Sequence, residues 1–493
     1  MKRRCARILS VFLVVAVIVG VVPLMVGCNF DRKVAKAAKK LNSYDIVATL
    51  DDENKKIEAV EKVKIRNTFG NDVFELWFLL YGRAFRDGAT ILPYSPSSKA
   101  KCFPDGESFG NLEILYVRQN GLDLEFRLDG EDENALVVLA ELKKGKTIEI
   151  EIGFVLTLAK TTHRLGYFDG NINLGNWYPI LCVYENGKWV CDPYYSNGDP
   201  FYSECANYKV SVVYPEKYDI GSTGEITKEV KENGNKKTTA EAKAVRDFAV
   251  VLGEDFVGKE ARVGETTVVF LGYDNDTDID RNLDTAKRAL TTFNKMFGVY
   301  PYRTLTVAKT PFLYGGMEYP NLVWIADNIS DDLEIVKVIV HEIAHQWWYG
   351  VVGNNEVKCA YIDESMAEYS TAMFFDKNKN YNYSCKQMVQ DAATSYELYS
   401  EVISSINGTI NDKLNLPSNE FATEYEYVYV VYVKGVMFLD ALREKVGDKA
   451  FLKALESYYK KFAFKTATRD DFLSAFSKAN GDDISDFFNE WKA

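Results

Sequence analysis

Two of the three histidines in this 493-residue chain lie four positions apart in one segment, VIVHEIAHQWWYG. Residues four apart share one face of an α-helix, so His341 and His345 can reach the same metal ion. Glu342 is rotated from that face by about 100°, which lets it contact a water beside the ion. We therefore expect a zinc site with two imidazole ligands and with Glu342 as general base.

The same segment predicts the helix that carries this site. Ser330 is placed to cap the helix, and Asp331 and Asp332 suit its positively polarised first turn. Gly350 is expected to end it. The alternative is a pair of core histidines, which would need hydrogen-bond partners for both rings. A chance HExxH is rare in a chain with so few histidines, which favours the metal site.

A catalytic zinc site needs a third protein ligand and one open position. Glu364, in YIDESMAEYS, follows His345 after eighteen intervening residues and lies on the next helical pattern. The alternative for Glu364 is a solvated helix carboxylate, and Glu368 or Glu356 could take the ligand position instead. The expected cofactor is a single Zn²⁺ ion.

Four motifs resemble those of the gluzincin zinc aminopeptidases, the family of aminopeptidase N and leukotriene hydrolase. GGMEY is similar to GAMEN, and HEIAHQWWYG with Glu364 is similar to HExxH-x18-E. VYVKG places Tyr432 at the tyrosine of YxKG, and the closing ISDFFNEW is similar to the end of the catalytic domain. The chain departs from the family at Tyr319, where GAMEN has Asn, and at Asp363 and Ser365 beside the third ligand.

The resemblance implies a catalytic role for each matching residue. His341, His345 and Glu364 would hold zinc. Glu342 would take a proton from the attacking water and pass it to the leaving amine. Tyr432 would donate a hydrogen bond to the developing oxyanion, although a core tyrosine is the alternative in this tyrosine-rich stretch.

The resemblance also implies how a peptide substrate would bind. Glu318 would bind the free α-amine, and the backbone at Gly315 and Gly316 would line the peptide like an added strand. Alone, the two glycines would indicate only a turn. The expected activity is that of a zinc aminopeptidase acting on peptides with free N-termini. A thermolysin-like endopeptidase and a non-catalytic peptide-binding protein on the same fold are the alternatives; Glu318 favours the aminopeptidase because an internal peptide bond offers it no cation.

The hydrophobic pattern changes along the chain and predicts more than one domain. Over about 44–256 apolar residues recur at every second position, as in IEIEIG from Ile148, which is typical of strands with one buried face. After residue 278 the spacing becomes that of amphipathic helices. We expect an all-β, sandwich-type domain over 31–260, followed by a thermolysin-like α+β, mainly helical domain over 261–493.

The first 28 residues are expected to be a targeting segment. Basic MKRR precedes an apolar run and LMVGC, which resembles a bacterial lipobox with Cys28 as the lipidated residue. An uncleaved membrane anchor is the alternative, although Pro23 interrupts the run. Either way, we expect the rest of the chain outside the cytoplasm, tethered to a membrane. The net charge of −12 argues against nucleic acid as a partner.

A hairpin at Asn186-Gly187 would place two cysteines opposite each other. Paired outward from the turn, Cys182 faces Cys191 at a non-hydrogen-bonded position, where Cα atoms approach to about 4.5 Å. A disulfide and two free core thiols are both compatible with this register.

Overall fold

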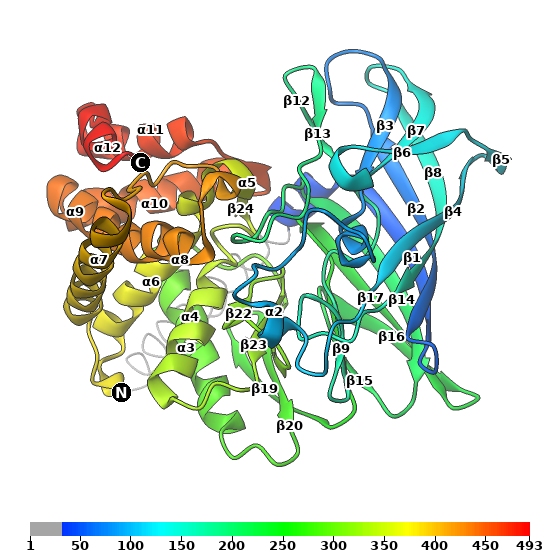
Figure 1. Cartoon of the computed structure of the whole chain (residues 1–493), viewed down its shortest axis with the longest axis horizontal. Coiled ribbons are helices and arrows are strands. Elements are labelled where there is room, and N and C mark those ends of the chain that lie inside the picture. The colour runs from blue at the N-terminus through cyan, green and yellow to red at the C-terminus, as the bar shows by residue number, and fades with distance from the viewer. Residues whose placement is uncertain (1–31) are drawn as a thin grey trace, which may run out of the picture.

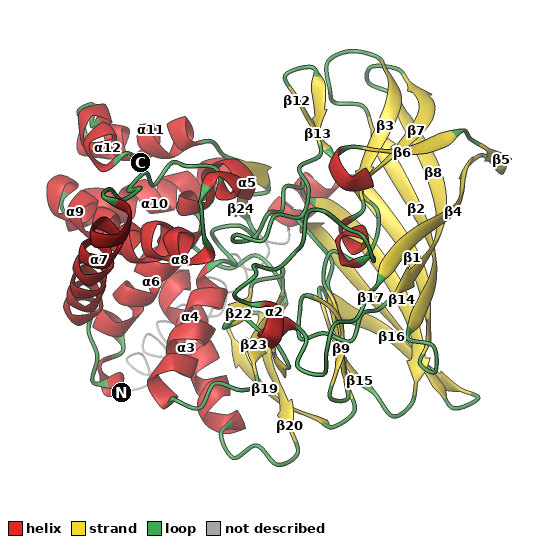
Figure 2. Cartoon of the chain, viewed as in Figure 1, coloured by secondary structure: helices red, strands yellow, loops and turns green. Residues whose placement is uncertain are grey.

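The computed structural model describes residues 32–493, which form two halves that meet along a broad seam (Figure 1). One half consists almost wholly of strands, and the other is mainly helical (Figure 2). The predicted fold class, an all-β part followed by a mixed, mainly helical part, is confirmed. The predictions for the targeting segment, Cys28 included, fall outside the described residues. Within residues 32–493 no helix has the length and apolar character to cross a membrane.

The largest sheet of the β half contains eight strands, in the order β16 (Glu225–Glu232), β17 (Asn235–Val245), β14 (Ala206–Pro215), β1 (Asn42–Asp51), β2 (Lys56–Arg66), β8 (Thr147–Thr157), β4 (Asn111–Gln119) and β5 (Leu122–Asp123). The predicted alternation is seen in β8, where Ile150 and Ile152 are buried and Glu149 is exposed. Strands β1 and β14 pair in parallel, whereas β1 and β2 are antiparallel.

Two four-stranded sheets complete the β half. One has the order β15 (Asp219–Ser222), β18 (Val250–Gly253), β10 (Asn171–Leu174), β9 (Leu165–Phe168), and the other β11 (Ile180–Leu181), β3 (Val73–Leu79), β7 (Ala135–Leu142), β6 (Phe126–Asp129). Short helical turns lie between the strands: η1 (Tyr81–Phe85), α2 (Lys99–Cys102) and η2 (Glu131–Glu133). Buried side chains of all three sheets belong to one continuous hydrophobic core, as in a sandwich.

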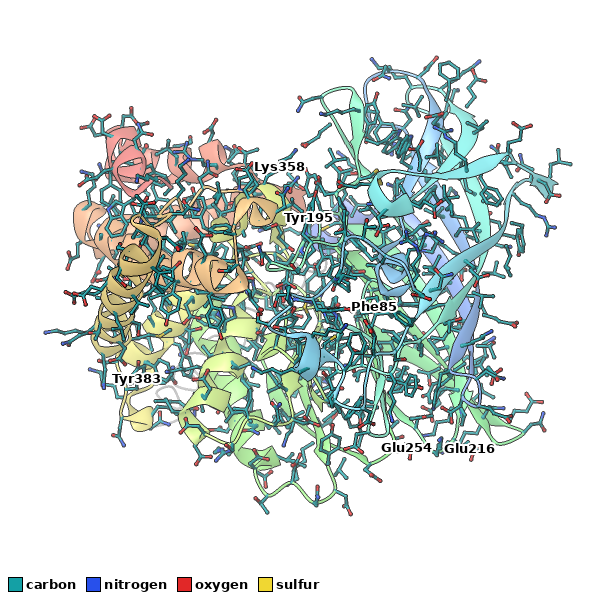
Figure 3. All side chains as sticks on the ribbon, viewed as in Figure 1. Phe85, Tyr195, Glu216, Glu254, Lys358 and Tyr383 are labelled. Carbon is teal, nitrogen blue, oxygen red and sulfur yellow. A yellow bond between two sulfur atoms is a disulfide. The ribbon has the colours of Figure 1, made fainter. Side chains whose placement is uncertain are left out.

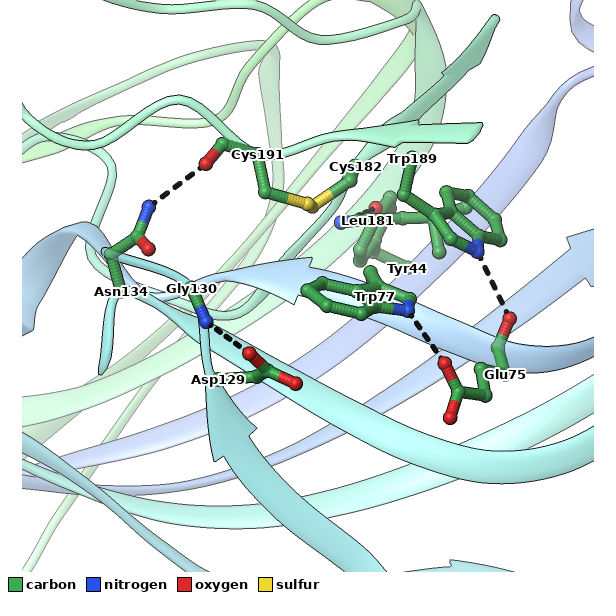
Figure 4. Close-up of a disulfide and its surroundings, with 10 residues drawn as sticks. All are labelled: Tyr44, Glu75, Trp77, Asp129, Gly130, Asn134, Leu181, Cys182, Trp189 and Cys191. Atoms are coloured by element: carbon green, nitrogen blue, oxygen red, sulfur yellow. Dashed lines mark hydrogen bonds between the residues drawn. A yellow bond between two sulfur atoms is a disulfide. The ribbon is translucent and has the colours of Figure 1, made fainter. Parts of the chain in front are cut away.

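The hairpin of β12 (Val183–Glu185) and β13 (Lys188–Val190) has the predicted register. Cys182 and Cys191 form a disulfide just beyond its last pair (Figure 4). Their Cα atoms are 5.8 Å apart, so the expected approach to about 4.5 Å was wrong. The ladder ends at Val183 and Val190, and beyond it the strands are free to diverge.

A five-stranded sheet opens the second half, in the order β19 (Phe256–Val263), β20 (Thr266–Tyr273), β21 (Thr304–Thr310), β23 (Leu322–Ala326) and β22 (Gly316–Met317). The predicted boundary at residues 260 and 261 falls inside β19, which pairs with β20 along its whole length. The division into 31–260 and 261–493 stays a prediction. The short strand β22 lies at the edge of this sheet.

Helices make up most of the remaining chain: α3 (Ile279–Met296), α4 (Asp332–Ala344), α5 (Glu356–Cys359), η3 (Ala360–Ile362), α6 (Glu364–Lys377), η4 (Lys379–Tyr381), α7 (Cys385–Asn407), η5 (Ser418–Glu420), α8 (Glu424–Tyr427), the π-helical η6 (Val428–Lys434), α9 (Gly435–Val446), α10 (Asp448–Phe462), α11 (Arg469–Asn480) and α12 (Ser485–Trp491). A two-stranded sheet joins β24 (Val352–Gly353) to β25 (Lys465–Thr466). Helix α3 buries an apolar stripe of Leu283, Ala286, Leu290 and Phe293. Gly298 follows the helix with a φ of 124°.

Helix α4 differs from its predicted bounds at both ends. Asp331, and not Ser330, is the cap: its carboxylate accepts hydrogen bonds from the backbone amides of Leu333 and Glu334. The helix ends at Ala344, earlier than the predicted stop at Gly350. Beyond Ala344 the amides of Gln346 and Trp347 reach back only three residues, to the carbonyls of Ile343 and Ala344, and Gly350 donates its amide five residues back to His345, so the regular helical hydrogen bonding stops. His345 itself keeps helical backbone angles, so its side chain stays on the predicted face.

Buried polar contacts join the two halves. The guanidinium of Arg246, from the β half, donates to the carbonyl oxygens of Tyr349 (2.9 Å) and Lys465 (3.0 Å) in the helical half. Lys358 lies at the rim of the seam (Figure 3). Its side chain pairs with Glu185 at 3.2 Å. These contacts hold the β half and the helical half against each other along the seam.

Candidate active site

Three side chains converge where helices α4 and α6 meet. The Nε2 atoms of His341 and His345 are 3.0 Å apart, and Oε2 of Glu364 lies 3.4 Å and 3.2 Å from them. All three residues are buried, and their ligand atoms lie within 4.8 Å of one another. Two imidazole nitrogens and one carboxylate oxygen form the donor set of catalytic zinc sites. The structure thus brings the three predicted ligands together as a candidate metal site.

The far side of each ring is held by a hydrogen-bond acceptor. Nδ1 of His341 is 2.7 Å from Oε2 of Glu368, and Nδ1 of His345 is 3.0 Å from the carbonyl oxygen of Trp348. This leaves both Nε2 atoms turned toward Glu364, as metal-binding histidines require. Glu368, one alternative third ligand, therefore lies behind a ring and not beside the metal position.

Burial and hydrogen bonds act in opposite directions on the pKa values of this cluster. Burial disfavours a charged His341 ring, but hydrogen bonds with Glu364 and Glu368 raise its pKa well above the usual range. Burial also opposes the Glu364 carboxylate, but hydrogen bonds from the two histidines lower its pKa. The carboxylates thus attract positive charge to the point between the rings, which a divalent cation satisfies.

Glu356, the other alternative ligand, is not part of this cluster. Its side chain is only 3% exposed, and neither carboxylate oxygen has a hydrogen-bond partner. Burial raises its pKa well above the usual range, with the nearby charge of Asp363 adding to the effect. Neutral burial is the state that these surroundings favour for Glu356.

Glu342 lies beside the candidate metal site with no hydrogen bond to its Oε2 atom. Burial raises its pKa to about 7, close to the value that suits a general base near neutral pH. A Cβ atom on Gly316 would approach Oε1 of Glu342 to 2.5 Å. The glycine therefore lets β22 pass directly over the carboxylate.

Tyr432 projects from the π-helical segment η6, and its ring stacks on His341 with centroids 5.8 Å apart. Burial raises the pKa of its hydroxyl, with the Glu364 charge as the next cause, so the group stays a proton donor. The hydroxyl of Ser365 donates to the carbonyl of Val431 at 2.6 Å. This bond ties Tyr432's segment to the helix that carries Glu364.

Two other tyrosines lie near Tyr432 in the sequence. The ring of Tyr427 lies 5.9 Å from that of Tyr432, and both residues line one pocket, described below. Tyr429 stacks instead on Tyr399, with centroids 4.3 Å apart. Of the two, only Tyr427 faces the candidate site.

Glu318 lies next to an acid that the sequence did not single out. Carboxylate oxygens of Asp199, Glu318 and Glu364 all lie within 4.8 Å of one another. Burial raises the pKa of Glu318 well above the usual range, and the charge of Asp199 adds to the shift. Asp199 comes from a loop of the β half and forms an ion pair with the buried Arg164. No motif surrounds it in DPYYSNGDP, so only the fold reveals it.

A pocket of about 430 Å³ lies at the seam between the halves, and its lining includes His341, Glu342, Tyr432 and, from the β half, Asp199. Gly315 and Gly316 line it, and β22 is an edge strand to which an extended peptide can be added. Tyr319, which departs from the GAMEN pattern, is fully buried and donates its hydroxyl to Asn176 of the β half at 3.1 Å. Its side chain thus joins the two halves.

The architecture is that of the two-domain M1 zinc metallopeptidases. A crystal structure of such an enzyme from Deinococcus radiodurans, in a mutant form, superposes with a TM-score of 0.67 at 16% identity, covering 92% of this chain and 94% of that one. A second structure, with a bound Tyr-Ser-Ala substrate, gives a TM-score of 0.66 at 17% identity over similar shares, 92% and 94%.

The sequence comparisons match part of the chain to proteins of the M1 family. Residues 281–491 match the model of the Peptidase family M1 domain. A probable aminopeptidase 2 from Sulfurisphaera tokodaii is 24% identical over 308 residues, 58% of this chain and 38% of the relative. Aminopeptidase N from Lactobacillus helveticus is 28% identical over 229 residues, 43% and 26% of the two chains. The alignments with these curated relatives thus span well under half of their length.

Proposed function

We propose that this chain is a zinc-dependent aminopeptidase that removes N-terminal residues from peptides. The observation that carries the proposal is that the cluster of His341, His345 and Glu364 adjoins the acid pair of Asp199 and Glu318, and that His341 and Asp199, one member of each, line the same pocket. The M1 family match and the names of the relatives, which are aminopeptidases, support it.

The acid pair would bind the substrate's free α-amine. That amine is a cation near neutral pH, and moving it into a closed site costs several kcal/mol unless a counter-charge meets it. Arg164 already pairs with Asp199, so Glu318 would be the acid that the amine meets, and the incoming cation would favour the ionised form that burial alone disfavours. The amine position in turn sets which peptide bond lies beside the metal cluster.

Proton transfer would fall to Glu342. A zinc ion held by the cluster would polarise the scissile carbonyl and activate water. Glu342 would accept the proton of the attacking water and deliver it to the leaving amine. Tyr432, kept protonated by burial, would donate a hydrogen bond to the developing oxyanion.

An assay on aminoacyl-coumarins and their N-acetylated forms, with and without chelator, tests this function. We expect chelator-sensitive release from the free amines and little from the acetylated forms. Equal cleavage of both would replace the aminopeptidase with an endopeptidase. Binding without any cleavage would favour a peptide-binding protein.

We also propose that residues 1–28 tether the enzyme to a membrane on the outer side of the cell, through a lipid on Cys28. The basic start, the apolar run and LMVGC support this. Cys28→Ala should release the protein from membranes or leave an uncleaved precursor. An intact Met1 in the mature wild-type protein, found by mass spectrometry, would favour an uncleaved anchor helix.

A further inference from the structure

Carboxylates outnumber cationic side chains around the pocket. Its acidic lining residues are Asp199, Glu334, Glu342, Glu368 and Glu424, against Arg164 and Lys337. Most of these acids already have a partner or a proposed role. Asp199 pairs with Arg164, Glu334 lies 3.8 Å from Lys337, and Glu368 contacts His341. Glu342 is the proposed base, which leaves Glu424.

Glu424 is held in place without being neutralised. Its Oε2 atom accepts hydrogen bonds from the hydroxyls of Ser95 at 2.5 Å and Ser98 at 2.7 Å, both buried residues of the β half. A hydroxyl orients a carboxylate but does not cancel its charge. Among residues 32–493, no lysine or arginine forms an ion pair with Glu424. Glu424 is therefore held at the pocket wall without an ion-pair partner of its own.

Glu424 belongs to the part of the wall where the amine would bind. Tyr314, directly before the two glycines, holds the Arg164 guanidinium over its ring at 4.8 Å. Burial raises the pKa of Tyr314; the charge of Arg164 opposes this shift and the charge of Glu424 adds to it, so both charges act on the same hydroxyl. A substrate's first side chain and its amine leave the same Cα atom, so that side chain would meet this region of the wall.

We infer that Glu424 makes this pocket selective for peptides whose N-terminal residue carries a guanidinium or ammonium group. The inference rests on the proposed aminopeptidase function and names its substrate class. A long basic side chain would bring its cation to the fixed carboxylate. A neutral side chain of equal length would leave that carboxylate desolvated and unpaired.

The test measures kcat/KM of the full chain on arginyl- and citrullinyl-coumarin, which differ in charge but hardly in shape. We expect the wild type to prefer arginine. The ratio of the two kcat/KM values should fall about tenfold or more in Glu424→Gln, because losing a hydrogen bond to a charged group weakens binding by about that factor. The kcat/KM for norleucyl-coumarin should change little.

Two controls separate charge from structure. Glutamine keeps an acceptor for both serines, and thermal unfolding would show that the fold is intact. Glu426→Gln removes a charge from the same helix outside the pocket lining and should leave the preference unchanged.

Calorimetry with argininamide and norleucinamide gives a second readout that needs no turnover. Tighter binding of argininamide, lost in Glu424→Gln, would support the inference even if no substrate were cleaved and the proposed function failed. Cleavage of norleucyl-coumarin with no arginine preference would overturn the inference and leave the proposed function standing. A preference for arginine that survives Glu424→Gln would also overturn it.

Discussion

The two ends of the pocket are assembled in different ways. The metal end, as we call the proposed zinc site, comes from one stretch of chain: His341 lies in α4, His345 caps the end of that helix, and Glu364 begins α6. The amine end, as we call the acids proposed to bind the substrate's amine, joins Glu318 to Asp199, which belong to different halves of the molecule. Local helix geometry therefore fixes the first end, whereas packing across the seam fixes the second. Changes at the metal end should affect every substrate, and changes at the amine end should depend on the substrate.

The largest effect is expected from His345→Ala. Losing one of three ligands should remove both zinc and activity for all substrates. Metal analysis and coumarin assays would check this together. Glu356→Gln is the matched control, because it alters a nearby buried acid that lies outside the ligand cluster and should retain zinc. Full activity in metal-free protein would contradict the metal assignment.

Glu342→Gln should separate chemistry from metal binding. The amide keeps the shape of the side chain but cannot accept a proton, so kcat should fall by at least about 10²-fold. Zinc content should remain that of the wild type, because Glu342 is not in the ligand cluster. Loss of metal in this variant would instead make Glu342 part of the site's structure.

Tyr432→Phe should slow turnover by about 10²–10³, the cost of removing one oxyanion donor. The phenyl ring can still stack on His341, so zinc content and stability should change little. Near wild-type turnover would transfer the role to Tyr427, which lines the same pocket. Tyr429→Phe is the control, because Tyr429 stacks on Tyr399.

Substitutions at the amine end should have smaller effects on kinetics, and these effects should depend on the substrate. Glu318→Ala should raise KM and lower kcat together, since the amine anchor also positions the scissile bond. It should also narrow the gap between free and N-acetylated substrates. Asp199→Asn should act in the same direction, with zinc retained in both variants. Equal losses on free and acetylated substrates would place Glu318 with the metal end and remove the distinction between the two ends.

The sequence predicted the metal end because its information is local. A four-residue spacing on a helix fixes the relative directions of two rings, and the resemblance supplied Glu364 and Tyr432. The end of α4 was misplaced because the turn after Ala344 depends on contacts with later residues, such as the bond from Gly350 to His345. Glycine alone could not locate that turn.

Asp199 could not be predicted for a different reason. It lies in an irregular loop without a motif, and its partners are far away in the sequence. The strand pattern correctly predicted an all-β half, but it carries no information on which loop of that half faces the second half. That choice depends on buried contacts across the seam, such as those of Arg246.

The smallest effect is expected at a site that touches neither end. Asp52 follows β1, where Lys217 lies 2.8 Å from its carboxylate and Tyr218 donates to it at 2.7 Å. Burial opposes its charge, but hydrogen bonds from Lys217, Lys55 and Tyr218 lower its pKa to about 2. Because the folded pKa lies below the unfolded value of 3.8, the contacts of the Asp52 carboxylate stabilise the protein above pH 3.8. This stabilisation is lost as pH falls through the folded pKa of about 2. Asp52→Asn should therefore lower the free energy of unfolding by less than about 1 kcal/mol at pH 6, because solvent screens the pair. Urea titrations should show this difference shrinking toward pH 3, with kcat/KM unchanged; a difference that grows as pH falls would reverse the assigned sign.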